Sequence, residues 1–126
     1  MTNAHKPRYR REHGPMEVPL RVVRFEDQIA ILRKEPAWEH GQRVAKTLVK
    51  EGGLSVLLTL MRSGTALHEH RTEGAVTIQC LAGRMTLNAH GGATELIEGE
   101  MVALDRGIEH SVEAATETAL LVTIAQ

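Results

Sequence analysis

Short apolar runs and regularly spaced glycines indicate that this chain folds into β-sheets, apart from one short helix near the start. From residue 43 onward, runs rich in Val, Ile, Leu and Thr alternate with turns that contain glycine. Regular short strands of this kind are typical of β-sandwiches and β-barrels. The chain has 126 residues and 42% hydrophobic content, which suffices for one packed core and leaves no room for two.

The first third of the chain is expected to contribute an arm, a strand and a helix. Residues 1–15 carry a cluster of Lys and Arg between prolines, which indicates a flexible basic arm ahead of a single domain over 16–126. The β-branched run 18–25 predicts an edge strand, because Pro19 lacks the N–H donor that a central strand needs. In 26–35, apolar residues at helical spacing and acidic residues ahead of basic ones predict a helix.

The rest of the chain is expected to form strands joined by tight turns. Gly52 and Gly53 can adopt positive φ between two apolar runs, so 43–61 is predicted to be a hairpin. A helix over 43–50 is the competing interpretation, since that stretch contains good helix formers. The further predicted strands are 65–70, 75–82, 84–89, 93–98, 99–105, 106–114 and 118–125.

Composition and charge argue against several classes of function. A net charge of −1 gives no overall attraction for nucleic acid, and the chain has one Trp, one Tyr and one Phe, too few to stack bases. Cys80 is the single cysteine, so no intrachain disulfide can form and a reducing compartment is favoured. The start lacks the apolar stretch of a secretory signal and no run is long enough to span a membrane, so we expect a cytoplasmic protein.

The stretch 65–73, TALHEHRTE, places His68 and His70 one residue apart on a predicted strand. Residues i and i+2 of a regular strand project from the same face, so the two imidazoles are expected to stand side by side. A stable metal site needs at least a third ligand, and His110 on a later predicted strand is the candidate. Without that third histidine, the pair is equally well explained as two solvated side chains.

Two glycine-framed segments that contain these histidines resemble the two sequence motifs of the cupins. The first, GTALHEHRTEGAVTIQCLAG at 64–83, has the paired histidines and the closing glycine. The second, GEMVALDRGIEHSVEA at 99–114, has two glycines and a histidine at the spacing of the family. The resemblance implies a single-domain cupin, a jelly-roll barrel or double-stranded β-helix, with His68, His70 and His110 as metal ligands.

The chain departs from these motifs at several positions. Arg62 stands where the family has its opening glycine, Asp105 where it prefers proline, and Ala114 where the pattern ends in asparagine. Val76 stands where the family has a glutamate that ligates the metal. The resemblance therefore implies a site made of histidines alone, as in some cupin dioxygenases that lack the glutamate.

A fourth ligand, if the site has one, must come from another position. Glu73 lies in the loop after the paired histidines and Gln79 on the next strand, and both are candidates. Alternation along that strand places Val76, Ile78 and Cys80 on one face and Gln79 on the other. Val76, Ile78 and Cys80 are expected to form an apolar wall behind the ion. Cys80 is interpreted as a core residue rather than a ligand.

Three neutral imidazoles with open coordination positions suit a divalent transition metal, here Fe, Zn, Ni, Cu or Mn. The first hypothesis is a small metal-dependent enzyme, of dioxygenase, isomerase or lyase type, that acts on a small oxygenated molecule. A non-catalytic module that binds a small molecule or a metal is the second, and a structural dimer without metal is the third. The resemblance also implies a homodimer, for which the apolar runs 18–25 and 54–61 could supply an interface. Neither nucleic acid nor a membrane is an expected partner.

Overall fold

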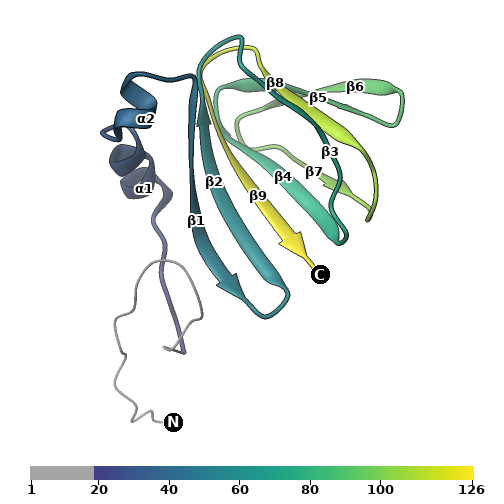
Figure 1. The fold of residues 1–126 in the computed structure, drawn as a ribbon, viewed down its shortest axis with the longest axis horizontal. Coiled ribbons are helices and arrows are strands. Elements are labelled where there is room, and N and C mark those ends of the chain that lie inside the picture. Colours follow the sequence, from purple (N-terminus) through teal and green to yellow (C-terminus); the bar gives the residue numbers. More distant parts are fainter. Residues whose placement is uncertain (1–18) are drawn as a thin grey trace.

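The computed structural model describes residues 19–126, except for the side chains of Glu69 and His70. In this part of the chain two helices precede nine strands, and the strands form two antiparallel sheets that pack face to face (Figure 1). The helices are α1 (Phe25–Leu32) and α2 (Pro36–Glu39). The strands are β1 (Arg43–Glu51), β2 (Leu54–Met61), β3 (Ala66–His70), β4 (Ala75–Ala82), β5 (Arg84–Ala89), β6 (Gly92–Ile97), β7 (Met101–Leu104), β8 (His110–Ala114) and β9 (Thr118–Ala125). The arm predicted for residues 1–15 lies outside the described residues.

Strands that are far apart in the sequence lie next to one another in both sheets, as in a jelly roll. The five-stranded sheet has the order β1-β2-β9-β4-β7, and the four-stranded sheet has the order β3-β8-β5-β6. The last strand, β9, lies between β2 and β4 and pairs with both. The predicted all-β cupin jelly roll is confirmed, although within 19–126 no ladder joins the two sheets into a closed barrel.

The hairpin predicted for 43–61 is present as β1 and β2, and the competing helix over 43–50 is wrong. At the turn Gly52 has a φ of 58°, which glycine adopts without strain because it has no Cβ. The helix propensity of the run 43–50 is outweighed by the sheet, in which β2 pairs with β9 on the side away from β1. Because both edges of β2 are paired within the chain, 54–61 offers no open edge for a dimer.

The edge strand predicted for 18–25 is wrong for the described part of that run. Residues 19–24 form no strand, and α1 begins directly after them. The edge that this run would join is β1, where a register shift interrupts the regular row of donors and acceptors. A side chain makes the contact instead, since the Arg21 guanidinium donates to the Leu48 carbonyl at 2.6 Å.

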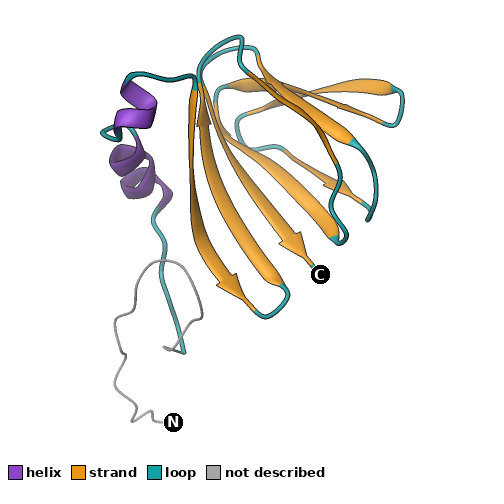
Figure 2. Ribbon diagram, viewed as in Figure 1, coloured by secondary structure: helices purple, strands orange, loops and turns teal. Residues whose placement is uncertain are grey.

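Both helices lie beside β1, on the outer face of the five-stranded sheet (Figure 2). Trp38 of α2 is buried there, as expected for an aromatic residue that packs a helix on a sheet. The Arg62 guanidinium donates to the carbonyls of Gly41 at 3.0 Å and Trp38 at 2.7 Å, and it lies 4.1 Å from the centre of the Trp38 ring. The residue that replaces the motif's opening glycine thus fixes α2 to the sheet. Within 19–126 no helix has the length and apolar character needed to cross a membrane.

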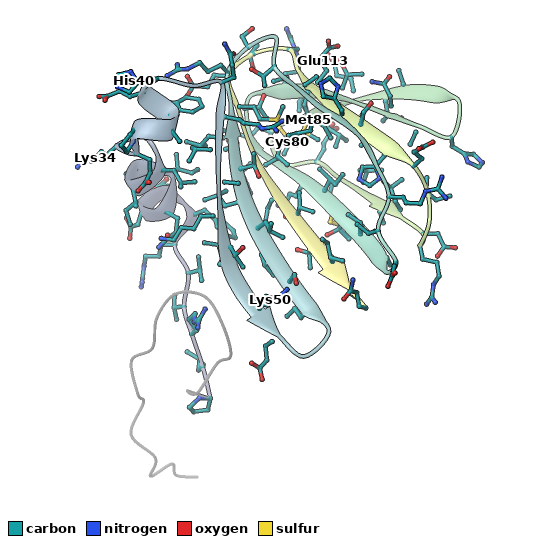
Figure 3. All side chains as sticks on the ribbon, in the orientation of Figure 1. Lys34, His40, Lys50, Cys80, Met85 and Glu113 are labelled. Carbon is teal, nitrogen blue, oxygen red and sulfur yellow. The ribbon has the colours of Figure 1, made fainter. Side chains whose placement is uncertain are left out.

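The main core lies between the two sheets, and we call it the inner cluster. It forms because alternate residues of each strand face the opposite sheet. Figure 3 shows Cys80 of β4 and Met85 of β5 in this core. The buried members of the inner cluster are Met61, Val76, Ile78, Cys80, Met85, Leu87, Leu96, Val112, Ala114 and Leu120.

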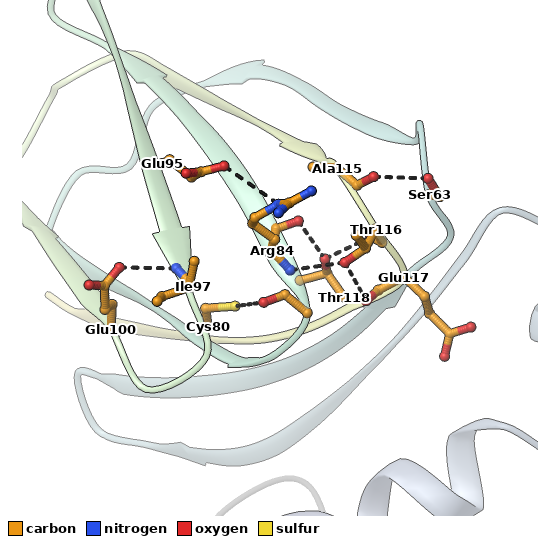
Figure 4. A network of polar contacts seen from close by, with 11 residues as sticks. Ser63, Cys80, Arg84, Glu95, Ile97, Glu100, Ala115, Thr116, Glu117 and Thr118 are labelled. Atoms are coloured by element: carbon orange, nitrogen blue, oxygen red, sulfur yellow. Dashed lines mark hydrogen bonds and ion pairs between the residues drawn. The ribbon is translucent and has the colours of Figure 1, made fainter.

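A polar network closes one end of the sandwich, which we call the closed end (Figure 4). The Thr118 hydroxyl donates to the Arg84 carbonyl at 3.0 Å, and the Arg84 N–H donates to the Thr116 hydroxyl at 3.0 Å. Ser63 donates to the Ala115 carbonyl at 3.0 Å and ties the connection between β2 and β3 to the same turn. The inner side chains with 0% exposure at this end are Met61, Cys80, Met85 and Leu120.

Gly83 at the closed end is predicted not to tolerate a side chain. It has a φ of +89°, and a Cβ there would lie 2.2 Å from the Glu117 carbonyl oxygen. Gly99 is the matched control, with a φ of +92° and nothing within 4 Å of a Cβ. Gly99→Ala should cost about 1–2 kcal/mol for the left-handed backbone, and Gly83→Ala about 1–3 kcal/mol more because the crossing backbone must move. Urea denaturation measures both variants, and equal losses would contradict the close contact.

Candidate functional site

The predicted ligands lie at the opposite end of the sandwich, where β3 and β7 end and β4 and β8 begin. We call this the histidine end. His70 is the last residue of β3 and His110 the first of β8, and their Cα atoms are partners in the antiparallel ladder. Backbone pairing continues past β3, because the Gly107 N–H donates to the Thr72 carbonyl at 3.0 Å. Strand pairing thus brings together histidines from the two predicted motifs.

His110 is buried, with 2% of its surface exposed, on the inner side of β8 with Val112 and Ala114. Its Nδ1 lies 3.0 Å from the carbonyl oxygen of Ile108. Because a carbonyl oxygen can only accept, Nδ1 carries the proton in this contact and Nε2 carries the lone pair that a metal ligand requires. A backbone carbonyl therefore sets both the tautomer and the orientation of the His110 ring.

The structure does not place His68 and His70 in a regular strand. The register of β3 on β8 shifts just before His70, so that β3 contains one residue more than its partner over this stretch. Such a bulge interrupts the alternation on which the i, i+2 expectation rested. His68 is exposed and lines a groove of about 480 Å³ on the outer side of the four-stranded sheet, together with Asn88 and Ser111. The side chain of His70 lies outside the described residues, so its direction stays a prediction.

The other predicted site residues divide by burial. Glu73 is exposed in the connection between β3 and β4, and Gln79 is partly buried. Val76, Ile78 and Cys80 are at most 2% exposed and belong to the inner cluster, so the alternation expected along this strand is confirmed. Their role as the wall of a site remains a prediction.

Among the side chains that the structure describes, no three His, Cys, Asp or Glu groups lie close enough to hold one metal ion. A histidine centre at this end therefore depends on His70, whose side chain is not among them. The chemistry of the donors fits a transition metal, because imidazole nitrogens suit Zn, Cu, Fe and Ni. His110 also has the backbone hydrogen bond that orients metal-binding histidines.

Two charged side chains next to the candidate ligands form an exposed ion pair. Arg71 and Glu109 lie 3.8 Å apart, and more than half of each side chain is exposed, at 64% and 54%. Solvent screens a pair of this kind, so its contribution to stability is small. The pair joins the segment after β3 to the segment before β8.

Sequence reasoning missed the apolar residues that remain accessible at the histidine end. Leu104 of β7 and Val122 and Ile124 of β9 pack against the inner cluster but are only partly buried. Alternation from Leu120 could have placed the two β9 residues on the inner face. The Ile108 carbonyl could not have been found, since a backbone oxygen leaves no mark in a sequence.

Comparison with solved structures relates this architecture to known proteins, whereas no family model and no curated protein matches the sequence. A cupin-2 domain protein from Shewanella frigidimarina has a TM-score of 0.67 at 14% identity, over 83% of this chain and 95% of that one. A cupin superfamily protein from Desulfitobacterium hafniense has a TM-score of 0.65 at 13% identity, over 67% of this chain and 77% of that one.

This chain has the cupin fold. Salicylate 1,2-dioxygenase from Pseudoaminobacter salicylatoxidans, solved as adducts with gentisate, has a TM-score of 0.74 at 19% identity over 82% of this chain. Only 32% of the dioxygenase chain is covered, so the present chain spans about a third of that protein. A likeness at these identities establishes the cupin fold and leaves the reaction to the residues of the site.

Cys80 is predicted to be chemically inert in the folded protein. Burial raises the pKa of its thiol, and the carboxylates of Glu98 and Glu100 add to the rise. We therefore expect slow reaction with Ellman's reagent at mildly alkaline pH until the protein is unfolded, because the thiolate is the nucleophile. Rapid labelling of the native protein would contradict the burial.

The raised pKa of Cys80 also predicts a loss of stability at alkaline pH. The unfolded chain loses the thiol proton first, near about pH 8.5, while the folded chain retains it. The free energy of unfolding should therefore be independent of this group below that pH and fall as the pH rises toward the folded pKa. Urea denaturation across this pH range should show that the free energy of unfolding depends less on pH in Cys80→Ala than in the unmodified protein. The same pH dependence in both proteins would contradict the prediction.

Proposed function

We propose that this cupin-fold protein binds a divalent transition metal through His68, His70 and His110, and that it is a small metal-dependent enzyme acting on a small oxygenated molecule. The observation that carries the proposal is the pairing of His70 with the buried His110 at the histidine end. Directly opposed residues of an antiparallel pair have Cβ atoms about 4.5–5.5 Å apart, a separation from which two imidazoles can share an ion.

The third ligand depends on the bulge in β3. His68 completes the set if its ring turns from the outer groove toward the histidine end, and bulges are known to re-aim side chains next to active sites. If the ring stays in the groove, the remaining positions fall to Glu73 or water, since Gln79 lies on the outer face of β4, opposite Leu121. Metal content in single variants separates these two arrangements.

A bound metal would supply Lewis acidity, polarising an oxygen of the ligand and lowering the pKa of water. The chain's own contribution is to hold the His110 ring in the tautomer that presents Nε2, through the hydrogen bond to Ile108. Apolar side chains of the inner cluster keep water from the side of the ring that faces the core. Affinity should fall in acid, because metal-binding histidines must be neutral.

A non-catalytic binding module is the second candidate. It is favoured by Val76, which occupies the position of the family's glutamate, and by the exposure of Glu73. An enzyme of dioxygenase type is favoured by the fold shared with a dioxygenase that was solved with gentisate. Fold similarity alone is an analogy, so turnover has to decide between the two.

We predict that protein purified without chelators, or reloaded with Fe, Zn, Ni, Cu or Mn, holds close to one metal ion per chain. His70→Ala and His110→Ala should lose the metal, because each removes a ligand that the others cannot replace. His68→Ala reports whether the third imidazole takes part. His40→Ala is the matched control, since its side chain is 80% exposed and lies after α2. Elemental analysis and metal titration measure all four variants.

Two results would overturn the metal centre. One is failure of the native protein to bind any of these ions, and the other is an unchanged metal content in His110→Ala. Metal-loaded protein that consumes oxygen with gentisate or salicylate, or converts a β-diketone, supports the enzyme. Ligands that raise the melting temperature without any turnover support the binding module instead.

We also propose that the protein is a homodimer. The described segment 19–24 supports this, since Leu20 and Val22 are 69% and 63% exposed. Large apolar side chains on an extended segment are a common feature of protein interfaces. Light scattering gives the molar mass directly, and a monomeric mass at micromolar concentration would refute the dimer.

A further inference from the structure

The helices cover only half of the outer face of the five-stranded sheet. Both α1 and α2 contact β1, and α1 also contacts β2, as their place beside β1 in Figure 2 shows. The cluster that they bury includes Ala119 and Leu121 of β9, but within the described residues it includes nothing from β7. Toward the histidine end, the outer face of β9, β4 and β7 is therefore a surface without a covering layer in the described part of the chain.

We call the uncovered side chains on this half of the sheet the outer patch. They alternate with residues of the inner cluster, since Thr77 and Gln79 lie on either side of Ile78, which is 2% exposed. Thr77 pairs with Thr123 on one side and with Ala103 on the other, so the side chains of three neighbouring strands form one row. The members of the outer patch are Leu54, Thr77, Gln79, Met101, Ala103 and Thr123. Two of them are large apolar side chains in contact with solvent, Met101 at 57% and Leu54 at 41% exposure.

The strands of this surface are uncharged along their whole length. None of the four strands β2, β9, β4 and β7 contains a Lys, Arg, Asp or Glu residue. Every other strand in 19–126 contains at least one, for example Lys46 in β1, Arg84 in β5 and Glu113 in β8. Charged residues make up 25% of the chain, so their absence from four adjacent strands needs a physical reason. The nearest charges in the sequence, such as Glu100 and Asp105, lie in the connections at the strand ends.

A second copy of the chain gives that reason. A sheet face that stays in water normally carries polar and charged side chains, whereas the core of a protein interface is depleted of charge. Identical faces that meet around a two-fold axis gain further from this depletion, because a charged side chain near the axis would meet its own copy. The outer patch therefore fits a second copy better than it fits the N-terminal residues 1–18, which are rich in Lys and Arg.

We propose that the outer patch is the interface of the homodimer, and that it packs on the outer patch of a second copy around a two-fold axis that runs along β4. This inference rests on the homodimer proposed above and does not depend on the metal centre. Because β4 lies between β9 and β7, this axis makes β7 of one copy face β9 of its partner. Thr77, on the outer side of β4, faces the partner's Thr77.

The position of the helices fits this arrangement. Packed sheets lie about 10 Å apart, and an α-helix with its side chains is about 10–12 Å thick. The helices of one copy, which stand over β1 and β2, would therefore lie beside the β7 edge of the partner. Three strands give the patch a width of about 14 Å and a length of about 25 Å. The contact between the helices and the partner's β7 edge adds to that area, toward the roughly 800 Å² per partner of a standard interface.

Opposite charges introduced at one position test the axis. Thr77→Lys and Thr77→Glu each bring two like charges together, so each variant should dimerise at least about a hundredfold more weakly than the native protein. An equimolar mixture of the two variants should recover the dimeric mass, because Lys then meets Glu. Sedimentation equilibrium of the whole chain over a range of concentrations measures the dissociation constant in each case.

Thr86→Lys is the matched control. Thr86 has an outward position in the other sheet, where its ladder partners are Glu95 and Glu113, so this variant should keep the native dissociation constant. Circular dichroism and urea denaturation establish that each variant is folded. If Thr77→Lys fails to fold, Ala103→Lys replaces it, because Ala103 is exposed on the edge strand β7. Adding Thr123→Glu to that chain should restore the dimer, since β7 faces the partner's β9.

The outcomes separate this interface from the homodimer itself. A native protein that is monomeric refutes the homodimer and with it the interface. Native association in folded Thr77→Lys or Ala103→Lys leaves the homodimer in place and overturns the interface. Weaker association of both Thr77 variants without recovery in the mixture overturns the two-fold axis along β4, whereas weaker association with recovery supports the inference.

Discussion

Packing of the two sheets at the closed end is the interaction on which the rest of the structure depends. Met61, Cys80, Met85 and Leu120 are fully buried there, from strands of both sheets. Burying side chains of this size stabilises a fold by about 1.5–3 kcal/mol each, which is large against the marginal stability of a domain. The polar network around Arg84 satisfies the backbone where the chain crosses between the sheets.

The histidine end contains both buried and partly exposed side chains. Val76 is 2% exposed there, whereas its ladder partners Leu104 and Ile124 are partly exposed. His110 is also buried at this end, and its Nδ1 is hydrogen-bonded to the backbone carbonyl of Ile108. A polar group buried in an apolar region is costly unless it is hydrogen-bonded, so the contact with Ile108 both stabilises the fold and prepares a nitrogen for a metal.

Departures from the cupin motifs have different physical consequences. Arg62, at the place of a glycine, holds the carbonyls of α2 and stacks on Trp38, so the substitution is explained by the helices that cover the sheet. Asp105 accepts the N–H of Arg106 at 2.8 Å and stabilises the turn that a proline would have restricted. Val76 fills the inner cluster where a carboxylate would have been buried, and the core is correspondingly apolar at that point.

Residue patterns alone were enough for the strands, the hairpin around Gly52 and the inward face of Val76, Ile78 and Cys80. These features follow from local preferences and from alternation with a period of two, which act over a few residues. The absence of a strand at 19–24, the bulge between Leu67 and His70 and the carbonyl that orients His110 could not be read in that way. Each depends on which strands become neighbours and in what register, and that is settled only when distant segments compete for the same hydrogen bonds and the same core.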